Sequence, residues 1–473
     1  MELPAQALGA ETIRSRESDV SQSCQIHSAN KGDADLIPLL RAALPDGAIR
    51  RIVIKPNWVI HETDPDFPIR ALVTSPTLIE ATIDICIQKY EALESLLVAD
   101  VPIQSCDWQL LREQAGIDRL ESKYKSRSRP RIEFRDLRAQ RVRVLNGYLT
   151  PDTSSEDVGD PAGYSDVTLD QQSFLDPICE AATSFRVADY SPEETQSSHH
   201  KGYHRYRISR SLLECELFIN MPKMKTHQKA GMTGALKNLV GMNANKAFLV
   251  HFKAGSPGSG GDEFPPDVEW PIVLQARVHQ WARGKSKLLF RVLQKSWRAF
   301  RRLYGIEVKA TREGLGKRFL ISGGSWYGND SIWRMIYDLN KIVLYAKPDG
   351  GALAEVPQRH YLTIVDGLVA GEGNGPLQPL PVETGIVGIS ENPFVLDFCL
   401  ARLMGLDFRK IPQLSHHAEF GRDSWGDFDP ETIKVQWNGQ ELRGVGSLPV
   451  LHRFLPPAGW RGHVELEFND HAD

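Results

Sequence analysis

Short apolar runs alternate with amphipathic stretches in the first third of the chain. Residues 52–54 and 96–99 are wholly apolar, as buried strands are, and residues 132–134 form a third candidate strand. Ser75 and Pro76 predict the start of a helix between the first two runs, because serine is a preferred N-cap and proline fits the first helical position. This alternation predicts an α/β fold, with a doubly wound, mostly parallel sheet and helices on both faces.

The same alternation resumes in the second half of the chain. Further strands are expected at residues 217–220, 361–365 and 385–389, and further helices at residues 332–343 and 393–404. Two alternating runs separated by Asn438 and Gly439 predict a hairpin near the end of the sequence. The expected divisions of the chain are a flexible leader (1–30), an α/β domain (31–425) with a loop insertion (150–200) and a helical insertion (268–310), and a C-terminal β-hairpin appendage (426–473).

One stretch is strongly basic and has helical periodicity. Residues 271–305 contain nine Lys or Arg and no Asp or Glu. Basic residues recur every three or four positions, and apolar residues recur on another face: Lys287, Arg291, Lys295, Arg298 and Arg302 against Leu289, Leu293, Trp297, Phe300 and Tyr304. The pattern predicts a basic amphipathic helix at 286–304. Either it packs on its own domain with a solvated basic face, or it makes peripheral contact with an anionic membrane or an acidic partner.

Composition and charge narrow the class of protein. The chain has 473 residues, 41% of them hydrophobic, and a net charge of −4, so it is globular and no nucleic-acid partner is expected. No apolar run is long enough to span a membrane, and the first thirty residues lack the apolar core of a signal peptide. We therefore expect a cytoplasmic protein. No two of the six cysteines are closer than twenty residues, which favours reduced core thiols and no iron–sulfur cluster.

Polar residues follow several predicted strands. Lys55 and Asn57 follow the first strand, Asp100 the second, and Asn220 and Asp366 two later ones. In open α/β sheets, ligands bind beyond the carboxyl ends of the strands. At least some of these side chains are therefore expected to share a functional site.

The segment from Asn220 to Gly241 is the densest in candidate chemistry. Lys223, Lys225 and His227 alternate, so an extended chain would present them on one side. Gly231 and Gly234 then lead into a helix that carries Lys237 and Asn238. Free N–H groups at a helix start, together with lysines, predict an anion site, whereas the alternative is a surface loop with solvated lysines. The order of residues is not that of a phosphate-binding nucleotide loop.

Two further groups of residues extend the candidate site. Residues 366–381 are predicted to form a glycine-rich loop, in which Asp366 and Glu372 are candidates for acid–base work or metal binding. The candidates for a divalent metal site are His227, His251 and Asp262, although their spacing matches no tight metal signature.

Several of these motifs carry a family resemblance. KPNW at residues 55–58, PKMKTH followed by GALKNLVG, and DGLVAGEGNGP followed by the helix VLDFCLARLMG resemble the domain of unknown function 362 family. The resemblance spans roughly residues 35–410 in the same order. Many members of this family carry a four-cysteine ferredoxin-type segment, and this chain resembles a subgroup without it. The resemblance implies site residues without established roles, at Lys55, Asn57, Lys223, Lys225, His227, Lys237, Asn238, Asp366 and Glu372.

The sequence therefore predicts a cytosolic enzyme that binds a small anionic substrate, phosphorylated or carboxylated, at the carboxyl ends of the strands. Transfer or hydrolysis is the expected reaction, with or without a divalent metal. The predicted catalytic residues are His227, Asp100, Asp366 and Glu372, and the predicted substrate-binding residues are Lys55, Asn57, Lys223, Lys225, Lys237 and Asn238. The alternative function is that of a non-catalytic protein that acts at a membrane surface or on a partner through residues 286–304.

Overall fold

The structure of the chain is a computed structural model. It describes residues 22–28, 33–140, 142–145, 148–151, 159–180, 184–187, 190, 192–282, 287–303, 305–307, 318–319, 321–421 and 425–467. Side chains at 33–35, 142–151, 279–291, 294, 301, 306–307 and 318–319 lie outside this description.

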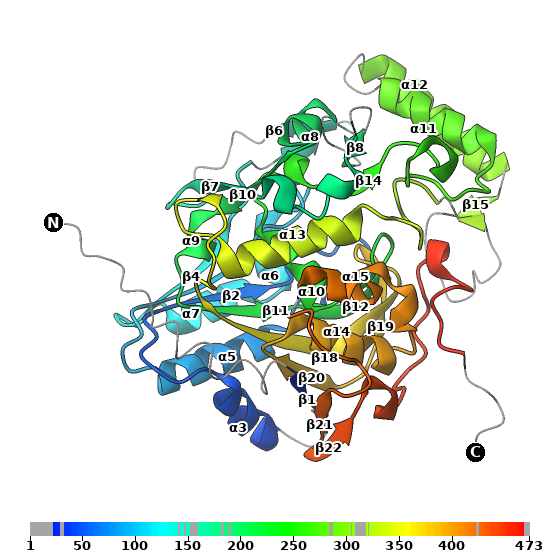
Figure 1. Ribbon diagram of the computed structural model, residues 1–473. Helices are drawn as coiled ribbons and strands as arrows, with labels where there is room; N and C mark the ends of the chain where they lie inside the picture. Colours follow the sequence, from blue (N-terminus) through cyan, green and yellow to red (C-terminus); the bar gives the residue numbers. More distant parts are fainter. Residues whose placement is uncertain are drawn as a thin grey trace.

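A large mixed sheet runs through the centre of the described molecule (Figure 1). Its strand order is β22-β21-β1-β20-β18-β11-β2-β3-β4. The parallel part consists of β18 (His360–Asn374), β11 (Leu217–Met221), β2 (Arg51–Pro56), β3 (Ser95–Asp100) and β4 (Arg131–Asp136). The predicted α/β class, with a mostly parallel sheet, is confirmed.

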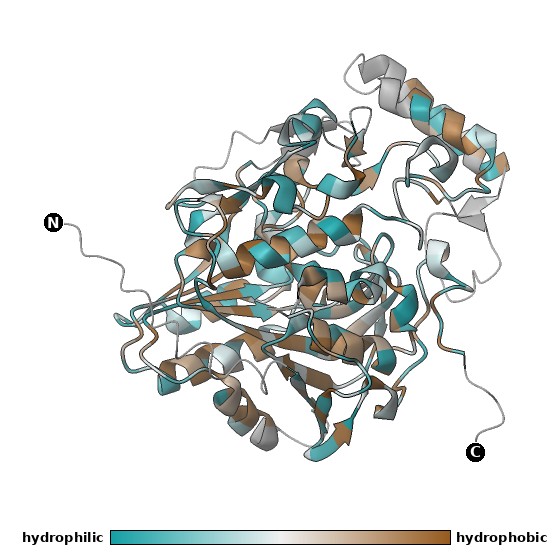
Figure 2. Cartoon of the chain, in the orientation of Figure 1, coloured by the Kyte–Doolittle hydropathy of each residue, from teal (hydrophilic) through white to brown (hydrophobic). Residues whose placement is uncertain are grey.

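Helices cover both faces of this sheet, because successive strand residues point to opposite sides. Ile52 and Ile54 pack in one hydrophobic core, whereas Val53 between them packs in the other. The first core is covered by α3 (Asp33–Ala43), α5 (Pro76–Lys89), α6 (Trp108–Gln114) and α7 (Ile117–Tyr124). The second is covered by α10 (Ala235–Asn238), α13 (Ile332–Tyr345), α14 (Pro393–Leu403) and α15 (Pro412–Ser415). Figure 2 shows the resulting apolar interior along the central strands.

The segment predicted as a glycine-rich loop at 366–381 is instead a hairpin. Strand β18 continues to Asn374 and returns as β19 (Gln378–Val382). The glycines in this strand and in its turn allow close packing: a Cβ at Gly371 would lie 2.6 Å from Cβ of Pro379, and one at Gly375 would lie 2.0 Å from the Thr226 carbonyl oxygen. Glycine can mark the close approach of another chain segment to a strand as well as a turn, which explains the error.

The leader and the appendage also differ from expectation. Residues 23–28, placed in a flexible leader, form β1 (Ser23–Ser28), in which Cys24 and Ile26 are buried. The predicted hairpin exists as β21 (Lys434–Trp437) and β22 (Gln440–Arg443), but it extends the main sheet by pairing with β1 rather than standing apart. Strand β1 is stabilised by pairing with β20 and β21. The local sequence of residues 23–28 does not reveal these two neighbours. The rest of the predicted leader, 1–21 and 29–30, lies outside the described residues.

The two predicted insertions contain regular structure. Within 150–200, the described parts include β7 (Tyr164–Thr168), β8 (Phe185–Arg186), α8 (Pro192–Ser198) and β9 (His199–His200). Strands β7 and β9 flank β10 (Tyr203–Ser209) in a small second sheet completed by β17 (Gly351–Ala352). The helical insertion holds α11 (Trp270–Ala282) and α12 (Lys287–Leu303), which project as a hairpin at the upper right of Figure 1.

The remaining described α-helices and β-strands are α4 (Ile69–Leu72), α9 (Arg210–Leu213), β5 (Val142–Leu145), β6 (Tyr148–Pro151), β12 (Lys223–His227), β13 (Gly231–Thr233), β14 (Phe252–Lys253), β15 (Ile306–Glu307), β16 (Arg318–Phe319) and β20 (Ile386–Ser390). All six cysteines are buried free thiols, as predicted. None of the helices in the described ranges has both the length and the apolar character needed to cross a bilayer.

Candidate functional site

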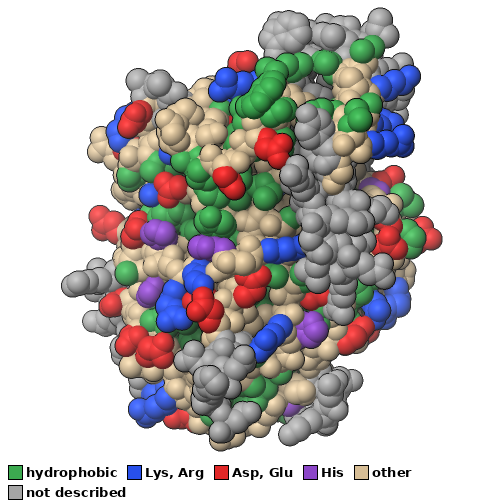
Figure 3. All heavy atoms as spheres, turned by 90° about the vertical axis from the view of Figure 1, so that its right-hand side faces the viewer, with side chains coloured by type: hydrophobic (Ala, Val, Ile, Leu, Met, Phe, Trp, Pro, Cys, Tyr) green, Lys and Arg blue, Asp and Glu red, His purple; other side chains and the backbone are tan. Residues whose placement is uncertain are grey.

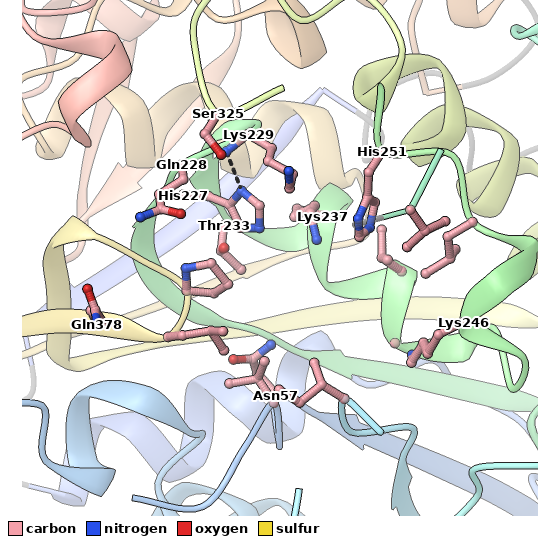
Figure 4. Close-up of a pocket in the computed structure, with 18 of the residues that line it drawn as sticks. Asn57, His227, Gln228, Lys229, Thr233, Lys237, Lys246, His251, Ser325 and Gln378 are labelled. Atoms are coloured by element: carbon pink, nitrogen blue, oxygen red, sulfur yellow. Dashed lines mark hydrogen bonds between the residues drawn. The ribbon is translucent and has the colours of Figure 1, made fainter. Parts of the chain in front are cut away.

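A cavity of about 730 Å³ lies beyond the carboxyl ends of β2 and β3. The hairpin of β12 and β13, the helix α10 and the chain that follows it supply much of its lining. The predicted site residues that line it are Lys55, Asn57, Asp100, His227, Lys237, Asn238 and His251. Figure 4 shows several of them converging from these elements.

Lys55 and Asp100 form a buried ion pair at the base of the cavity. The distance between Lys55 Nζ and Asp100 Oδ1 is 2.7 Å. Asp100 also accepts hydrogen bonds from the backbone N–H groups of Trp58 and Val101. Burial lowers the pKa of Lys55, and the adjacent Asp100 carboxylate opposes that shift. Asp100 is the one carboxylate among the described lining residues, and one amine already neutralises it.

A chain of amide side chains joins the strands beside this pair. Asn57 Nδ2 donates to Asn238 Oδ1, and Asn238 Nδ2 donates to Asn220 Oδ1. Lys225 Nζ donates to Asn57 Oδ1 and to the Leu72 carbonyl, at 2.7 Å each. Lys225 is fully buried and lies outside the cavity lining, so it orients Asn57 rather than facing the cavity. Burial, and then repulsion by neighbouring lysines, hold its pKa well below the usual range.

Lys237 and Lys246 are different, because neither ε-amine has a hydrogen bond or ion pair with a described residue although both line the cavity. Burial lowers the pKa of each to about 7, and repulsion by nearby Lys55 contributes to both shifts. In Figure 4 the amine of Lys237 is seen between the rings of His227 and His251. These amines are therefore close to half-protonated at neutral pH.

Thr233, at the end of β13, adds a third unsatisfied group. Its side chain is buried, lines the cavity, and its Oγ1 has no hydrogen-bond partner among the described residues. Buried hydroxyl groups are nearly always paired, with protein or with another molecule. Thr233 is therefore a candidate to bind a molecule in the cavity.

His227 is held in one tautomer by the turn that follows β12. Its Nδ1 accepts hydrogen bonds from the backbone N–H groups of Lys229 and Ala230, at 3.1 and 3.2 Å. Burial, and then repulsion by Lys237, keep its pKa well below the usual value. The neutral ring therefore carries its proton on Nε2. Gly231, with φ of +80°, provides the backbone conformation that closes this turn.

Other predicted site residues lie outside the cavity lining. Lys223 and Asp366 form a buried ion pair, with Lys223 Nζ 2.8 Å from Asp366 Oδ2. Asp366 also accepts hydrogen bonds from the backbone N–H groups of Ser75 and Leu368. Glu372 accepts a hydrogen bond from the Leu455 N–H and lies 3.5 Å from the partly exposed His452. The alternating residues of β12 thus have separate partners, and His227 is the one that reaches the cavity.

The predicted anion site at the helix start is filled by the protein itself. The N–H groups of Ala235 and Leu236, which begin α10, donate to the carboxylate of Asp397 at 2.6 and 3.0 Å. A Cβ at Gly234 would lie 2.0 Å from Asp397 Oδ1, so glycine is needed for this approach. Burial raises the pKa of Asp397 to about 7. Glycines before a helix indicated an anion-binding site, and the sequence could not show that Asp397, 162 positions after Ala235, occupies it.

The metal candidates are not gathered at one point. His227 and His251 line the cavity, but Asp262 does not; its Oδ2 accepts hydrogen bonds from the Ser331 hydroxyl and the Asp330 N–H. Within the described ranges there is no group of three or more His, Cys, Asp or Glu side chains arranged to hold a metal ion.

Sequence reasoning missed several lining residues. Lys246 and Lys229 contribute amines, and the Lys229 Nζ donates to the Gly323 carbonyl. Lys246 directly precedes the apolar run 247–250. Lysine side chains are rarely buried, so a lysine next to such a run could have been used to predict a site residue. Trp297 of α12 also lines the cavity, which places the basic helix beside the site.

Comparison with known proteins gives a family and two distant similarities. A thylakoid-associated protein of Synechocystis sp. is 38% identical over 60 residues, which are 13% of this chain and 19% of the relative. The matched segment thus spans about a fifth of that relative's length. A crystal structure of a Thermotoga maritima protein is similar at 10% identity, covering 77% of this chain and 56% of that one, with a TM-score of 0.33.

The family match covers far more of the chain than the Synechocystis similarity does. It extends over residues 157–402, just over half of the 473 residues, and includes β12, α10, the β18–β19 hairpin and most of α14. The motifs PKMKTH, GALKNLVG and DGLVAGEGNGP all lie within it. The chain belongs to the domain of unknown function 362 (DUF362) family.

Proposed function

We propose that this chain binds a small phosphorylated or carboxylated substrate in the cavity and catalyses transfer or hydrolysis there. The observation that carries the proposal is that Lys237, Lys246 and Thr233 line one cavity and that their side chains have no hydrogen-bond partners among the described residues. A buried polar group is costly to leave unpaired, so such a set favours a ligand with several acceptor oxygens.

Charge supports an anion in particular. The described lining residues contribute four lysines, Lys55, Lys229, Lys237 and Lys246, against the single carboxylate of Asp100. An anion that enters this excess of positive charge stabilises the protonated amines, and it therefore raises their pKa values. Lysine suits a phosphate or carboxylate as a point charge, without the fixed two-bond geometry of arginine.

The same groups support acid–base chemistry at neutral pH. An amine that becomes protonated when the anion enters can donate its proton to a leaving oxygen. The Nε2–H of His227 provides a second donor, fixed in direction by the backbone bonds to Nδ1. In this proposal Lys237 and Lys246 bind and protonate, His227 orients the substrate, and Asp100 holds Lys55. Asp366 and Glu372, which lie outside the lining, have no place in it.

The proposal is tested by calorimetric titration of the full chain with inorganic pyrophosphate. The wild type is expected to bind one equivalent, and Lys237→Met and Lys246→Met are each expected to weaken binding about tenfold or more, as loss of a charge-assisted hydrogen bond does. Lys347→Met, at an exposed lysine outside the cavity, is the matched control and should bind like the wild type. Unchanged affinity in both cavity variants would contradict the proposal.

That a divalent metal ion assists the reaction stays a prediction, and it has its own test. His227 and His251 are the described histidines of the lining, and their imidazole nitrogens could ligate a divalent metal ion. Elemental analysis of protein purified without added metal, compared with His227→Ala, is the measurement. A stoichiometric metal that is present in the wild type and lost in the variant would assign His227 to a metal site. If neither sample contains the metal, the proposal of a metal-assisted reaction is wrong.

A second candidate function follows from the hairpin of α11 and α12. Large apolar side chains are exposed on it, including Trp270 (73% exposed), Val292 (55%) and Leu303 (83%). Lys295, Arg298 and Arg302 are exposed on α12 as well. Figure 3 shows blue and green side chains together near the top of one face, where the hairpin lies. Exposed apolar and basic residues on one helix are typical of peripheral binding to anionic membranes.

Sedimentation with anionic lipid vesicles tests this second function. The wild type should bind at low salt and dissociate as salt increases. Changing Lys295, Arg298 and Arg302 to Glu should abolish binding, whereas the same change at the exposed Lys125, Arg127 and Lys347, elsewhere on the surface, should leave most of it. Equal loss in both triple variants would indicate non-specific attraction and contradict the assignment to α12.

A further inference from the structure

The cavity is larger than a bare phosphate or carboxylate requires. Its volume of about 730 Å³ lies within the range of pockets that enclose organic ligands of drug size, roughly 300–1,000 Å³. The lysines, Asn57 and Thr233 account for only part of the lining. The composition of the remaining wall therefore indicates which kind of anion fits the cavity.

Apolar side chains from separate parts of the chain form much of that wall. They are Val101, Ile103, Val240, Leu249, Trp297 and Leu377. Val101, Val240 and Leu249 are buried, whereas Leu377 is 40% exposed and marks the edge where the cavity meets solvent. Trp297 comes from α12, where it stacks on Phe300 with ring centroids 5.2 Å apart. An apolar wall gains free energy only from an apolar partner, since water in the cavity cannot satisfy it.

We infer that the ligand is an amphiphilic anion, in which a phosphate or carboxylate lies against Lys237 and Lys246 and an apolar group lies against Val101, Leu249 and Trp297. This inference rests on the proposed anion site and specifies the other part of the molecule that it binds. The two kinds of lining residue bind different parts of one ligand. The amines bind the charged group, and the apolar wall selects the group that is attached to it. A compact polar anion would fill the first role and leave the second unused.

The experiment measures affinity along a series of n-alkyl phosphates, from methyl to octyl, by calorimetric titration of the full chain below the micelle concentration of each probe. For a chain that enters the apolar part of the cavity, the association constant should rise about fourfold per added methylene until the wall is covered. Stoichiometry should remain one to one. Octyltrimethylammonium, which has the same chain and the opposite charge, should not bind.

Variants of the wall residues test whether the alkyl chain lies in the apolar part of the cavity. Trp297→Ala should reduce the gain per methylene while leaving the affinity for methyl phosphate unchanged. Trp270→Ala is the matched control, because Trp270 is an exposed tryptophan of the neighbouring helix α11 and lies outside the lining. Ile103→Ala, at a wall residue that follows β3, provides a second variant that does not depend on the α12 helix.

The outcomes separate this inference from the proposed function. If methyl phosphate binds and longer chains bind no better, the inference is wrong and the anion site stands. If a gain with chain length persists unchanged in Trp297→Ala and Ile103→Ala, the chains bind elsewhere, and the inference is again overturned. If no member of the series binds, both the inference and the anion site are contradicted.

Discussion

Lys55 Nζ lies 2.7 Å from Oδ1 of Asp100, and this contact joins the ends of two adjacent parallel strands beneath the cavity. Both side chains are buried. A paired charge in this position adds no net charge to the lining, so the anion-binding capacity comes from the other lysines. The pair also fixes the strand ends from which Asn57 and the following chain enter the site.

Loss of that pair should be costly to the fold. Asp100→Asn leaves a buried amine without its counter-charge and should lower the free energy of unfolding by about 3 kcal/mol or more. Asp46→Asn removes a partner of Lys89 in a pair whose carboxylate is 72% exposed, and it should cost less than about 1 kcal/mol. Chemical denaturation of both variants is the measurement. Equal losses would show that the Lys55–Asp100 pair is no more important than a surface contact.

Thr233 allows binding to be separated from stability. Its hydroxyl has no partner among the described residues, so Thr233→Val should leave the free energy of unfolding unchanged or slightly raised while it weakens pyrophosphate binding. The matched control is Thr226→Val in the same hairpin, where Oγ1 donates to the Gly373 carbonyl at 2.8 Å. That variant should lose about 1 kcal/mol of stability. If Thr233→Val binds pyrophosphate as the wild type does, the hydroxyl takes no part in the site.

Gly241 has no room for a side chain. A Cβ there would lie 2.4 Å from Asp100 Oδ1 and 2.6 Å from Lys55 Nζ. Gly241→Ala should therefore displace the ion pair and lower the free energy of unfolding by about 1–3 kcal/mol. Gly258→Ala, at a position with no atom within 4 Å of the added Cβ, should change it by less than about 0.5 kcal/mol. Thermal and chemical unfolding of the two variants provide the comparison.

Anion affinity should depend on pH in a defined direction. Burial lowers the pKa of Lys237 and Lys246 to about 7 in the free protein, and a bound anion raises both values. Below pH 7 the amines are already protonated, so affinity should be level. Above pH 7 binding must take up protons, so affinity should fall by up to about tenfold per pH unit for each amine.

Sulfate is the suitable probe for this profile, because its own charge does not change between pH 6 and 9. Calorimetry in buffers of different ionisation enthalpy would measure the proton uptake directly. Lys237→Met should remove one of the two protons and make the profile less steep. A flat profile in the wild type would contradict the assignment of these amines to the anion.

The sequence predicted the sheet and much of the site from strictly local patterns. Apolar runs marked β2, β3 and β11, and the polar residues just beyond them included Lys55, Asn57 and Asp100, all of which line the cavity. Prediction was possible because a parallel strand is a short buried run, and because its carboxyl end lies at one edge of the sheet.

Residues 366–374 and 23–28 show where local patterns failed. Glycines in the first segment indicated a loop, although they permit the close approach of β12 and β19 to β18. The second segment is a strand because β20 and β21 flank it. Both errors concern segments whose conformation depends on neighbours distant in the sequence.

The sequence by itself determined the fold class, the family and the strand ends from which the site is built, because each depends on residues that are adjacent in the chain. Only the tertiary structure decided which charges are neutralised: Asp366 pairs with Lys223, Asp397 occupies the start of α10, and Lys237 and Lys246 are left facing the cavity. Pairing depends on distances of a few ångströms between groups far apart in the sequence. Those distances are set by the packing of the sheet and its helices, and they determine where an anion can bind.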